Sequence, residues 1–273
     1  MLTGRFIATA GMIACVAVTL SAQWRVTTKS VPLTPDGKPN YAAPTPKMPD
    51  GMTPDLSGVW DVEKHPCTQA TIECLEPAPV GFINVATGAP EEPPMQPWAE
   101  ALVKQHRENS HIDDPNLRCL PHAPPRMWGN FVMQKLIQTP DTLTILDEFM
   151  GQYREIFLDG RPLPNDPEPT FKGYSVGRWQ GDTLVVDTIG IKGNWFDAQG
   201  HPLTDQARII ERIRRVSYGN LEVEVTVDDP KAYTRPWTRT LHLLLALNTE
   251  LFEFICNENE KDLQLILDAA KAK

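Results

Sequence analysis

The amino-acid sequence predicts a mainly β protein in which an antiparallel up-and-down meander closes into a barrel or half-barrel. Short segments rich in β-branched and aromatic residues are separated by turn pairs such as Pro140-Asp141 and Asp159-Gly160. The sequence shows no alternation of strands with long helices, which is the signature of a parallel sheet. A meander of this size normally curls, because closure removes its unpaired edges. A two-sheet sandwich is the alternative.

The predicted elements begin after a proline-rich segment. Residues 56–260 form the predicted β domain, with an irregular, disulfide-stapled insertion at 63–130 that holds one short helix at 97–107. A short amphipathic C-terminal helix is predicted over 261–273. The predicted strands are 56–62, 135–139, 142–146, 153–158, 174–179, 184–189, 207–216, 221–227, 238–245 and 251–256.

One pair of predicted strands carries complementary charge. Apolar residues alternate with Glu222 and Glu224 in the strand 221–227, which indicates a half-buried strand with one wet face. The preceding strand carries Arg208, Arg212 and Arg214. An inward row of arginines could bind an anion, but pairing with the acidic strand across the Gly219 turn is the favoured interpretation.

The N-terminal residues 1–22 have the pattern of a secretory signal peptide. Arg5 supplies a basic start, 6–20 is apolar and uncharged, and Ser21-Ala22 offers a small-residue cleavage site. Cleavage would leave no integral membrane span and a secreted or periplasmic chain. Acylation at Cys15, which would make a lipoprotein, is the less favoured alternative. The proline-rich arm 23–55 is expected to be extended, as a tether or a strap.

The bulk composition fits a globular β domain and disfavours some partners. The chain has 273 residues and a formal net charge of -9. Its basic residues are scattered, whereas nucleic acid requires a concentrated basic face, so no nucleic-acid partner is expected. No phosphate-cradling glycine loop or dinucleotide fingerprint is present, and no cofactor is predicted.

The cysteines favour disulfides. Signal cleavage leaves Cys67, Cys74, Cys119 and Cys256. An even number in an oxidising compartment indicates two disulfides, for which Cys67–Cys74 and Cys119–Cys256 are the favoured pairing among the three possible. A metal site is the rival interpretation. Because no CxxC motif and no tightly spaced pair of histidines occurs, no metal is predicted.

Three sequence motifs are distinctive when taken together: PDLSGVW at 54–60, GRWQGDTLVVDT at 177–188 and DDPKAYTRPW at 228–237. With these motifs the chain resembles an uncharacterised family of secreted Gram-negative bacterial proteins. The resemblance covers about 54–259 and implies export and β structure, with no established activity. The Gly58-x-Trp60 pattern also resembles the opening of lipocalins, which implies a lipocalin-like barrel.

A polar stretch between 159 and 205 contains the candidate site residues. His201 is the predicted general acid or base, because histidine titrates near neutral pH, and Asp205 could orient its ring. Asp187 ends a predicted strand, where it could face the mouth of the barrel, and is the third catalytic candidate. The predicted ligand-binding residues are Arg178, Trp179, Trp195, Tyr174 and Arg161, which combine aromatic surface with a cationic anchor. Each could instead be an ordinary turn, core or surface residue.

Three functions follow as hypotheses. The first is a secreted or periplasmic small-molecule-binding protein that holds an apolar or aromatic ligand in a β-barrel pocket. The second is a cofactor-independent hydrolase, lyase or isomerase that uses a His/Asp pair. The third is a structural or interaction module of the cell envelope. The sequence favours them in that order.

Overall fold

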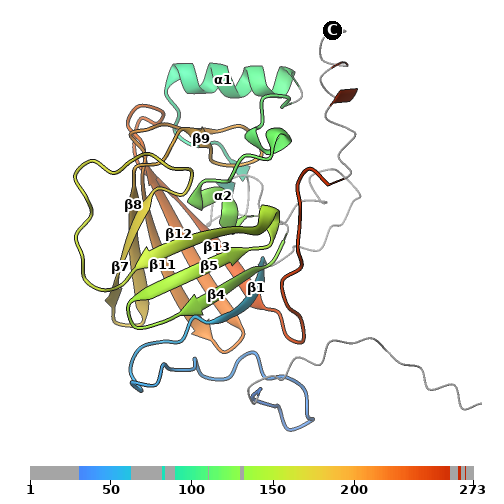
Figure 1. Cartoon of the computed structure of the whole chain (residues 1–273), viewed down its shortest axis with the longest axis vertical. Helices are drawn as coiled ribbons and strands as arrows, with labels where there is room; N and C mark the ends of the chain where they lie inside the picture. Colours follow the sequence, from blue (N-terminus) through green and yellow to red (C-terminus); the bar gives the residue numbers. More distant parts are fainter. Residues whose placement is uncertain are drawn as a thin grey trace, which may run out of the picture.

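Nine strands close into a barrel in which neighbouring strands follow one another along the chain (Figure 1). The structure is a computed structural model that describes residues 31–62, 82–83, 90–109, 111–129, 132–258, 264–265 and 268. Closure confirms the predicted β-barrel fold class. The barrel strands are β1 (Gly58–Val62), β4 (Gln134–Gln138), β5 (Thr142–Asp147), β6 (Gln152–Phe157), β7 (Tyr174–Gln180), β8 (Thr183–Ile189), β11 (Arg208–Ser217), β12 (Asn220–Asp228) and β13 (Trp237–Leu245).

The barrel departs from the predicted antiparallel meander at one seam. Strands β6 and β7 are parallel and pair only at Ile156–Ser175 and Phe157–Val176. An odd number of strands cannot alternate in direction all the way round a closed barrel, so at least one parallel pair is required. The long 158–173 connection provides it by returning the chain to the end of the barrel from which β6 began. The predicted antiparallel arrangement therefore holds for the other pairs of barrel strands, and this seam is the exception.

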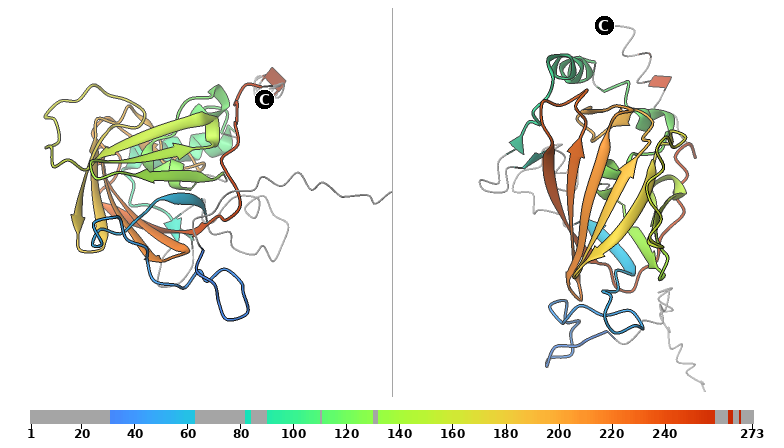
Figure 2. Two further views of the ribbon diagram at one scale, coloured as in Figure 1. Left: turned by 60° about the horizontal axis from the view of Figure 1, so that its bottom comes forward. Right: turned by 90° about the vertical axis from the view of Figure 1, so that its left-hand side faces the viewer.

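Shorter elements cover one end of the barrel. Helices α1 (Pro97–Glu108) and α2 (Pro124–Trp128) lie there with the hairpin of β9 (Asn194–Trp195) and β10 (Pro202–Leu203), whereas the N-terminal arm lies at the opposite end (Figures 1 and 2). Helix α1 confirms the helix predicted at 97–107. The remaining elements are β2 (Phe82–Ile83), β3 (Pro90–Glu91) and two 3-10 helices, η2 (Pro115–Arg118) and η3 (Phe149–Gly151).

Strands β11 and β12 follow the predicted alternation. The odd-numbered residues from Leu221 to Val227 are buried and belong to the main hydrophobic core. On the outer face, Arg214 approaches Glu222 at 3.3 Å and Arg212 approaches Glu224 at 3.8 Å, in register across the two strands. The predicted cross-strand charge pairing is confirmed.

The end of the barrel near the arm is closed by a tryptophan and an arginine. Trp60 is fully buried, and the Arg215 guanidinium lies over its ring at 4.9 Å from the centroid. Arg215 also donates hydrogen bonds to the carbonyl oxygens of Asp55, at 2.7 Å, and Tyr218, at 3.0 Å. One side chain thus joins the end of the arm, the first strand and the β11–β12 turn.

The strand predicted at 251–256 is absent, and these residues form no helix or strand. Strand β13 already pairs with β12 on one side and β1 on the other, so the closed barrel leaves no edge for another strand. The segment is instead held by the Cys119–Cys256 disulfide and by Phe254, which stacks on Phe149 at 5.1 Å between ring centroids. The predicted Cys119–Cys256 pairing is confirmed.

Several predictions fall on parts of the chain that the structure does not describe. The signal peptide 1–22, Cys15, Cys67 and Cys74 lie outside the described residues. The predicted C-terminal helix 261–273 also lies outside them, apart from residues 264, 265 and 268, which are helical. Among the helices of the described residues, none is long and apolar enough to cross a membrane.

Candidate functional site at the parallel seam

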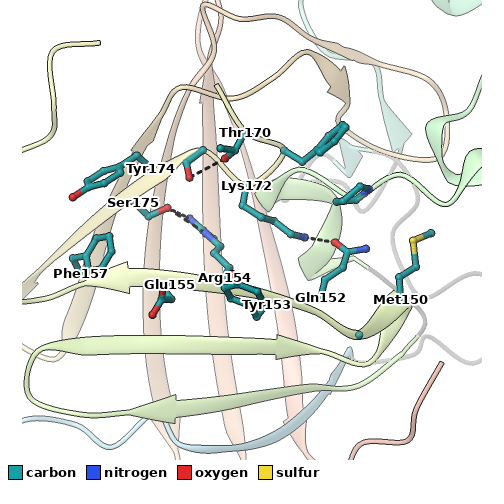
Figure 3. Close-up of a pocket in the computed structure, with 14 residues that line it drawn as sticks. Met150, Gln152, Tyr153, Arg154, Glu155, Phe157, Thr170, Lys172, Tyr174 and Ser175 are labelled. Atoms are coloured by element: carbon teal, nitrogen blue, oxygen red, sulfur yellow. Dashed lines mark hydrogen bonds between the residues drawn. The ribbon is translucent and has the colours of Figure 1, made fainter. Parts of the chain in front are cut away.

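A solvent-open cleft of about 520 Å³ lies where β6 and β7 diverge (Figure 3). Because these strands pair at only two positions, the first half of β6 separates from the 170–174 segment that leads into β7. The volume falls within the roughly 300–1,000 Å³ range of small-molecule sites. A closed barrel with an odd number of strands requires a parallel pair, and here that pair is β6–β7. The cleft lies where these two strands separate.

An aromatic pair forms one end of the cleft. Phe157 and Tyr174 both line it, with ring centroids 5.3 Å apart. Arg161 lies over the Phe157 ring at 3.9 Å and donates a hydrogen bond to the Tyr174 hydroxyl at 3.3 Å. Asp159 accepts from Arg161 and holds it in place. Of the predicted ligand-binding residues, Tyr174 lines this cleft. Arg161 does not line the cleft but contacts Phe157 and Tyr174, which do.

The inner wall of the cleft is a buried ion pair. Arg154 and Glu211 are 2% and 0% exposed, and Arg154 donates two hydrogen bonds to the Glu211 carboxylate, at 2.8 and 2.5 Å. Arg154 also donates to Ser175 at 3.1 Å and to Thr188 at 2.9 Å. The Trp128 indole donates to Glu211 at 2.5 Å. Four strands and α2 therefore meet at one polar centre.

Lys172 brings a second cationic side chain to the cleft wall. Its ammonium donates to Gln152 Oε1 and lies 3.9 Å from the sulfur of Met127 (Figure 3). Burial lowers the pKa of Lys172 to about 8; the negative charge of Asp147 opposes the shift and the positive charge of Arg154 adds to it. Near neutral pH Lys172 is protonated, but only a small free energy separates its protonated and neutral forms.

The other predicted ligand-binding residues do not line the seam cleft. Arg178 is exposed on β7, and Trp179 packs against the main core. Trp195 is buried at the capped end of the barrel, with its ring 4.3 Å from that of His106. The structure thus distributes these three residues over separate places.

His201 lies in a buried cluster at the capped end, 2% exposed. Its Nδ1 is 2.8 Å from Asp197, and its Nε2 is 2.9 Å from Glu92. Asp205 instead pairs with Lys231 at 3.0 Å, and Asp187 bonds to Arg208 at 2.8 Å. The predicted orientation of His201 by Asp205 is therefore corrected, because Asp197 occupies that position. The turn at 197–201 folds Asp197 back onto the ring, whereas Asp205 lies beyond β10.

The His201 cluster carries a stabilised positive charge. Burial alone would lower the pKa of His201, but the bonds to Asp197 and Glu92 outweigh it and raise the pKa to about 9. In turn, the bond to His201 lowers the pKa of Glu92 to about 2, with help from Arg107 at 2.7 Å. A histidine with both ring nitrogens engaged by carboxylates joins the β9–β10 turn to the segment that precedes α1. A catalytic role for His201 remains a prediction.

Raising the pH should loosen this cluster. The folded-state pKa of His201 is above its unfolded value, so its contribution to stability is complete below about pH 6.5 and is lost as the pH rises through about 9. We expect a loss of about 3 kcal/mol in unfolding free energy over that range. Urea unfolding at several pH values measures it.

Comparison with Asp197→Asn isolates the His201 contribution. The lowered pKa of Lys172 has the opposite sign and adds stability as the pH rises above about 8. The variant keeps Lys172, so subtracting its pH profile from that of the native chain removes the lysine contribution. Equal slopes for both proteins would contradict the assignment.

Sequence reasoning missed Arg154, Glu211, Gln152 and Lys172. For the first two a signal was present, since Glu211 is in phase with the buried Ile209 and Ile213. A charged residue on the inward face of a strand requires a buried partner. No comparable signal marks Lys172, because it belongs to an irregular connection.

Comparisons with known proteins do not identify the chain. No protein-family model matches it, and neither does any curated protein. The described residues also contain no group of three or more His, Cys, Asp or Glu side chains that could hold a metal ion.

Proposed function

We propose that the protein is an exported small-molecule-binding protein whose ligand occupies the cleft at the β6–β7 seam. The observation that carries the proposal is the combination of an open cleft with an aromatic end, formed by Phe157 and Tyr174, and polar groups at its inner wall. Small-molecule sites typically combine aromatic surface with a few fixed polar groups. The β-barrel fold is consistent with such a role.

Export is supported by two features of the chain. Residues 1–22 have the three-part pattern of a cleavable signal peptide. The Cys119–Cys256 disulfide favours an oxidising compartment, since disulfides rarely persist in the cytosol. The resemblance to a secreted Gram-negative family is part of the same proposal.

Binding of a neutral apolar probe tests the cleft. We expect the chain produced with its N-terminal segment to lose residues 1–22 and to bind one molecule of N-phenylnaphthylamine, as measured by fluorescence titration and native mass spectrometry. Tyr174→Ala should weaken binding about fivefold, because an aromatic contact contributes roughly 0.5–1.5 kcal/mol. Thermal unfolding confirms that the variant is folded.

The matched control is Phe252→Ala, which removes an aromatic ring that is 61% exposed and lies outside the cleft. This variant should bind the probe as the native chain does. Failure of the native chain to bind the probe would overturn the proposed function. It would favour the hypothesis of a structural or interaction module. Equal weakening by both variants would place the probe elsewhere.

A further inference from the structure

We propose that the ligand of the seam cleft is a monocarboxylate with an aromatic or aliphatic body, whose carboxylate is bound by Lys172 and Gln152. This inference rests on the proposed function and adds the chemical class of the ligand. The body would lie toward Phe157 and Tyr174, and the carboxylate would lie at the opposite end, where Lys172 and Gln152 meet (Figure 3).

The amide of Gln152 presents an unused donor. Its Oε1 accepts hydrogen bonds from two groups that can only donate, the Lys172 ammonium and the His122 backbone N–H. The amide therefore cannot flip without placing its own NH₂ against both donors. Nε2 is buried and has no hydrogen-bond partner in the part of the chain that the structure describes. A buried donor without an acceptor is costly, and an acceptor from a ligand would remove that cost.

Lys172 has a charge that its neighbours leave largely unpaired. The ion pairs within 4.0 Å among the described residues include five lysines, but not Lys172; the five are Lys38, Lys47, Lys104, Lys135 and Lys231. The charged groups around it are Asp147 on β5 and Arg154 on β6, with Glu155 on the cleft wall. Asp147 is directed toward the Phe149 backbone, whose N–H it accepts at 3.0 Å. An ammonium has three donors, so one remains for a ligand after Gln152 and Met127.

The charge balance favours a single negative charge on the ligand. Arg154 is already neutralised by Glu211 and also bonds to Ser175 and Thr188, so it has little capacity to bind an anion. Among the described residues that line the cleft, Lys172 is therefore the cation at the inner wall that a ligand would neutralise. A carboxylate carries one charge and two acceptor oxygens, which suits one ammonium and one amide donor. A dianion such as a phosphate monoester would bring a second charge into a partly buried site without a partner.

Matched acid and alcohol pairs test the inference by isothermal titration calorimetry at pH 7. Hydrocinnamate with hydrocinnamyl alcohol represents the aromatic body, and decanoate with decanol the aliphatic one. In the native chain at least one acid should bind at least about tenfold more tightly than its alcohol, as expected for a charge-assisted hydrogen bond. Lys172→Met should remove that preference and leave the alcohol unchanged, while Lys172→Arg should retain part of it.

The control is Lys135→Met, which removes a lysine that pairs with Glu250 outside the cleft. It should leave both affinities unchanged. The acid should also bind more weakly at pH 9 than at pH 7 in the native chain, because Lys172 loses its proton, and this change should vanish in Lys172→Met.

The outcomes separate the two proposals. If the neutral probe binds but acid and alcohol bind equally, or if Lys172→Met and Lys135→Met behave alike, the carboxylate inference is wrong and the binding function stands. If the neutral probe, the acids and the alcohols all fail to bind, the proposed function itself fails.

Discussion

Replacing Glu211 with alanine will lower the unfolding free energy by about 3–5 kcal/mol, the cost of leaving a buried charge without its partner. Arg154 is 2% exposed, so removal of the carboxylate would leave its charge largely desolvated and without its partner. The Trp128 indole N–H would lose its acceptor at the same time. The loss should appear in urea unfolding followed by tryptophan fluorescence, with a shifted midpoint.

The double variant Arg154→Met with Glu211→Leu is the informative control. Removing both charges leaves no uncompensated ion, and apolar side chains of similar volume often replace a buried pair at little cost. We therefore expect the double variant to be more stable than Glu211→Leu alone. The cycle completed by the single variants Arg154→Met and Glu211→Leu should give a coupling energy of at least about 1 kcal/mol. Additive losses would show that the two side chains act independently.

The Glu211 substitution should also lower the pKa of Lys172 on the cleft wall. Glu211 neutralises Arg154, which lies close enough to Lys172 to lower the pKa of that lysine. Without Glu211, the uncompensated guanidinium would repel the Lys172 ammonium more strongly. The buried pair thus has a functional consequence, because it allows a second cation to remain protonated at the cleft wall.

The sequence was sufficient for the local parts of the fold. In 221–227 the alternation of apolar and acidic residues predicted the buried face, the wet face and the charge pairs with β11, because all three depend on the period of two within a strand. The Cys119–Cys256 pairing was also predicted, though as one of three possibilities. The unpaired tail at 251–256 was not, since whether an edge remains depends on closure of the whole barrel.

The cleft, like the unpaired tail, depends on how the whole barrel closes and could be predicted only in part. Tyr174 was predicted from its type and its place at a strand start, and the structure places it on the cleft wall. Gln152 and Lys172 belong to different elements, and the parallel seam alone brings them together. No local sequence pattern predicts the parallel pair, because the need for one depends on the number of strands in the closed barrel. His201 shows the converse, since its residue type suggested chemistry while its neighbours Asp197 and Glu92 hold it in an ion cluster.

Removal of the Cys119–Cys256 disulfide is the second change from which we expect a large effect. The bond spans a sequence separation of 137, so it restricts the unfolded chain over about half its length. In the chain-entropy account such a long loop contributes about 4 kcal/mol or more. The Cys119→Ser, Cys256→Ser double variant should therefore lose about 4 kcal/mol in urea unfolding under non-reducing conditions.

The location of the loss distinguishes this prediction from general destabilisation. Residues 251–256 have no strand partner, and Phe252 and Ile255 are 61% and 47% exposed, so few contacts other than the disulfide and the Phe254–Phe149 stack hold the segment. Hydrogen exchange should accelerate in 246–258 well before it does in β12. Reducing the native chain should reproduce the double variant, and any further change on reducing that variant belongs to Cys67 and Cys74. Unchanged exchange in 246–258 would mean that packing around Phe254, and not the covalent bond, holds the tail against the barrel.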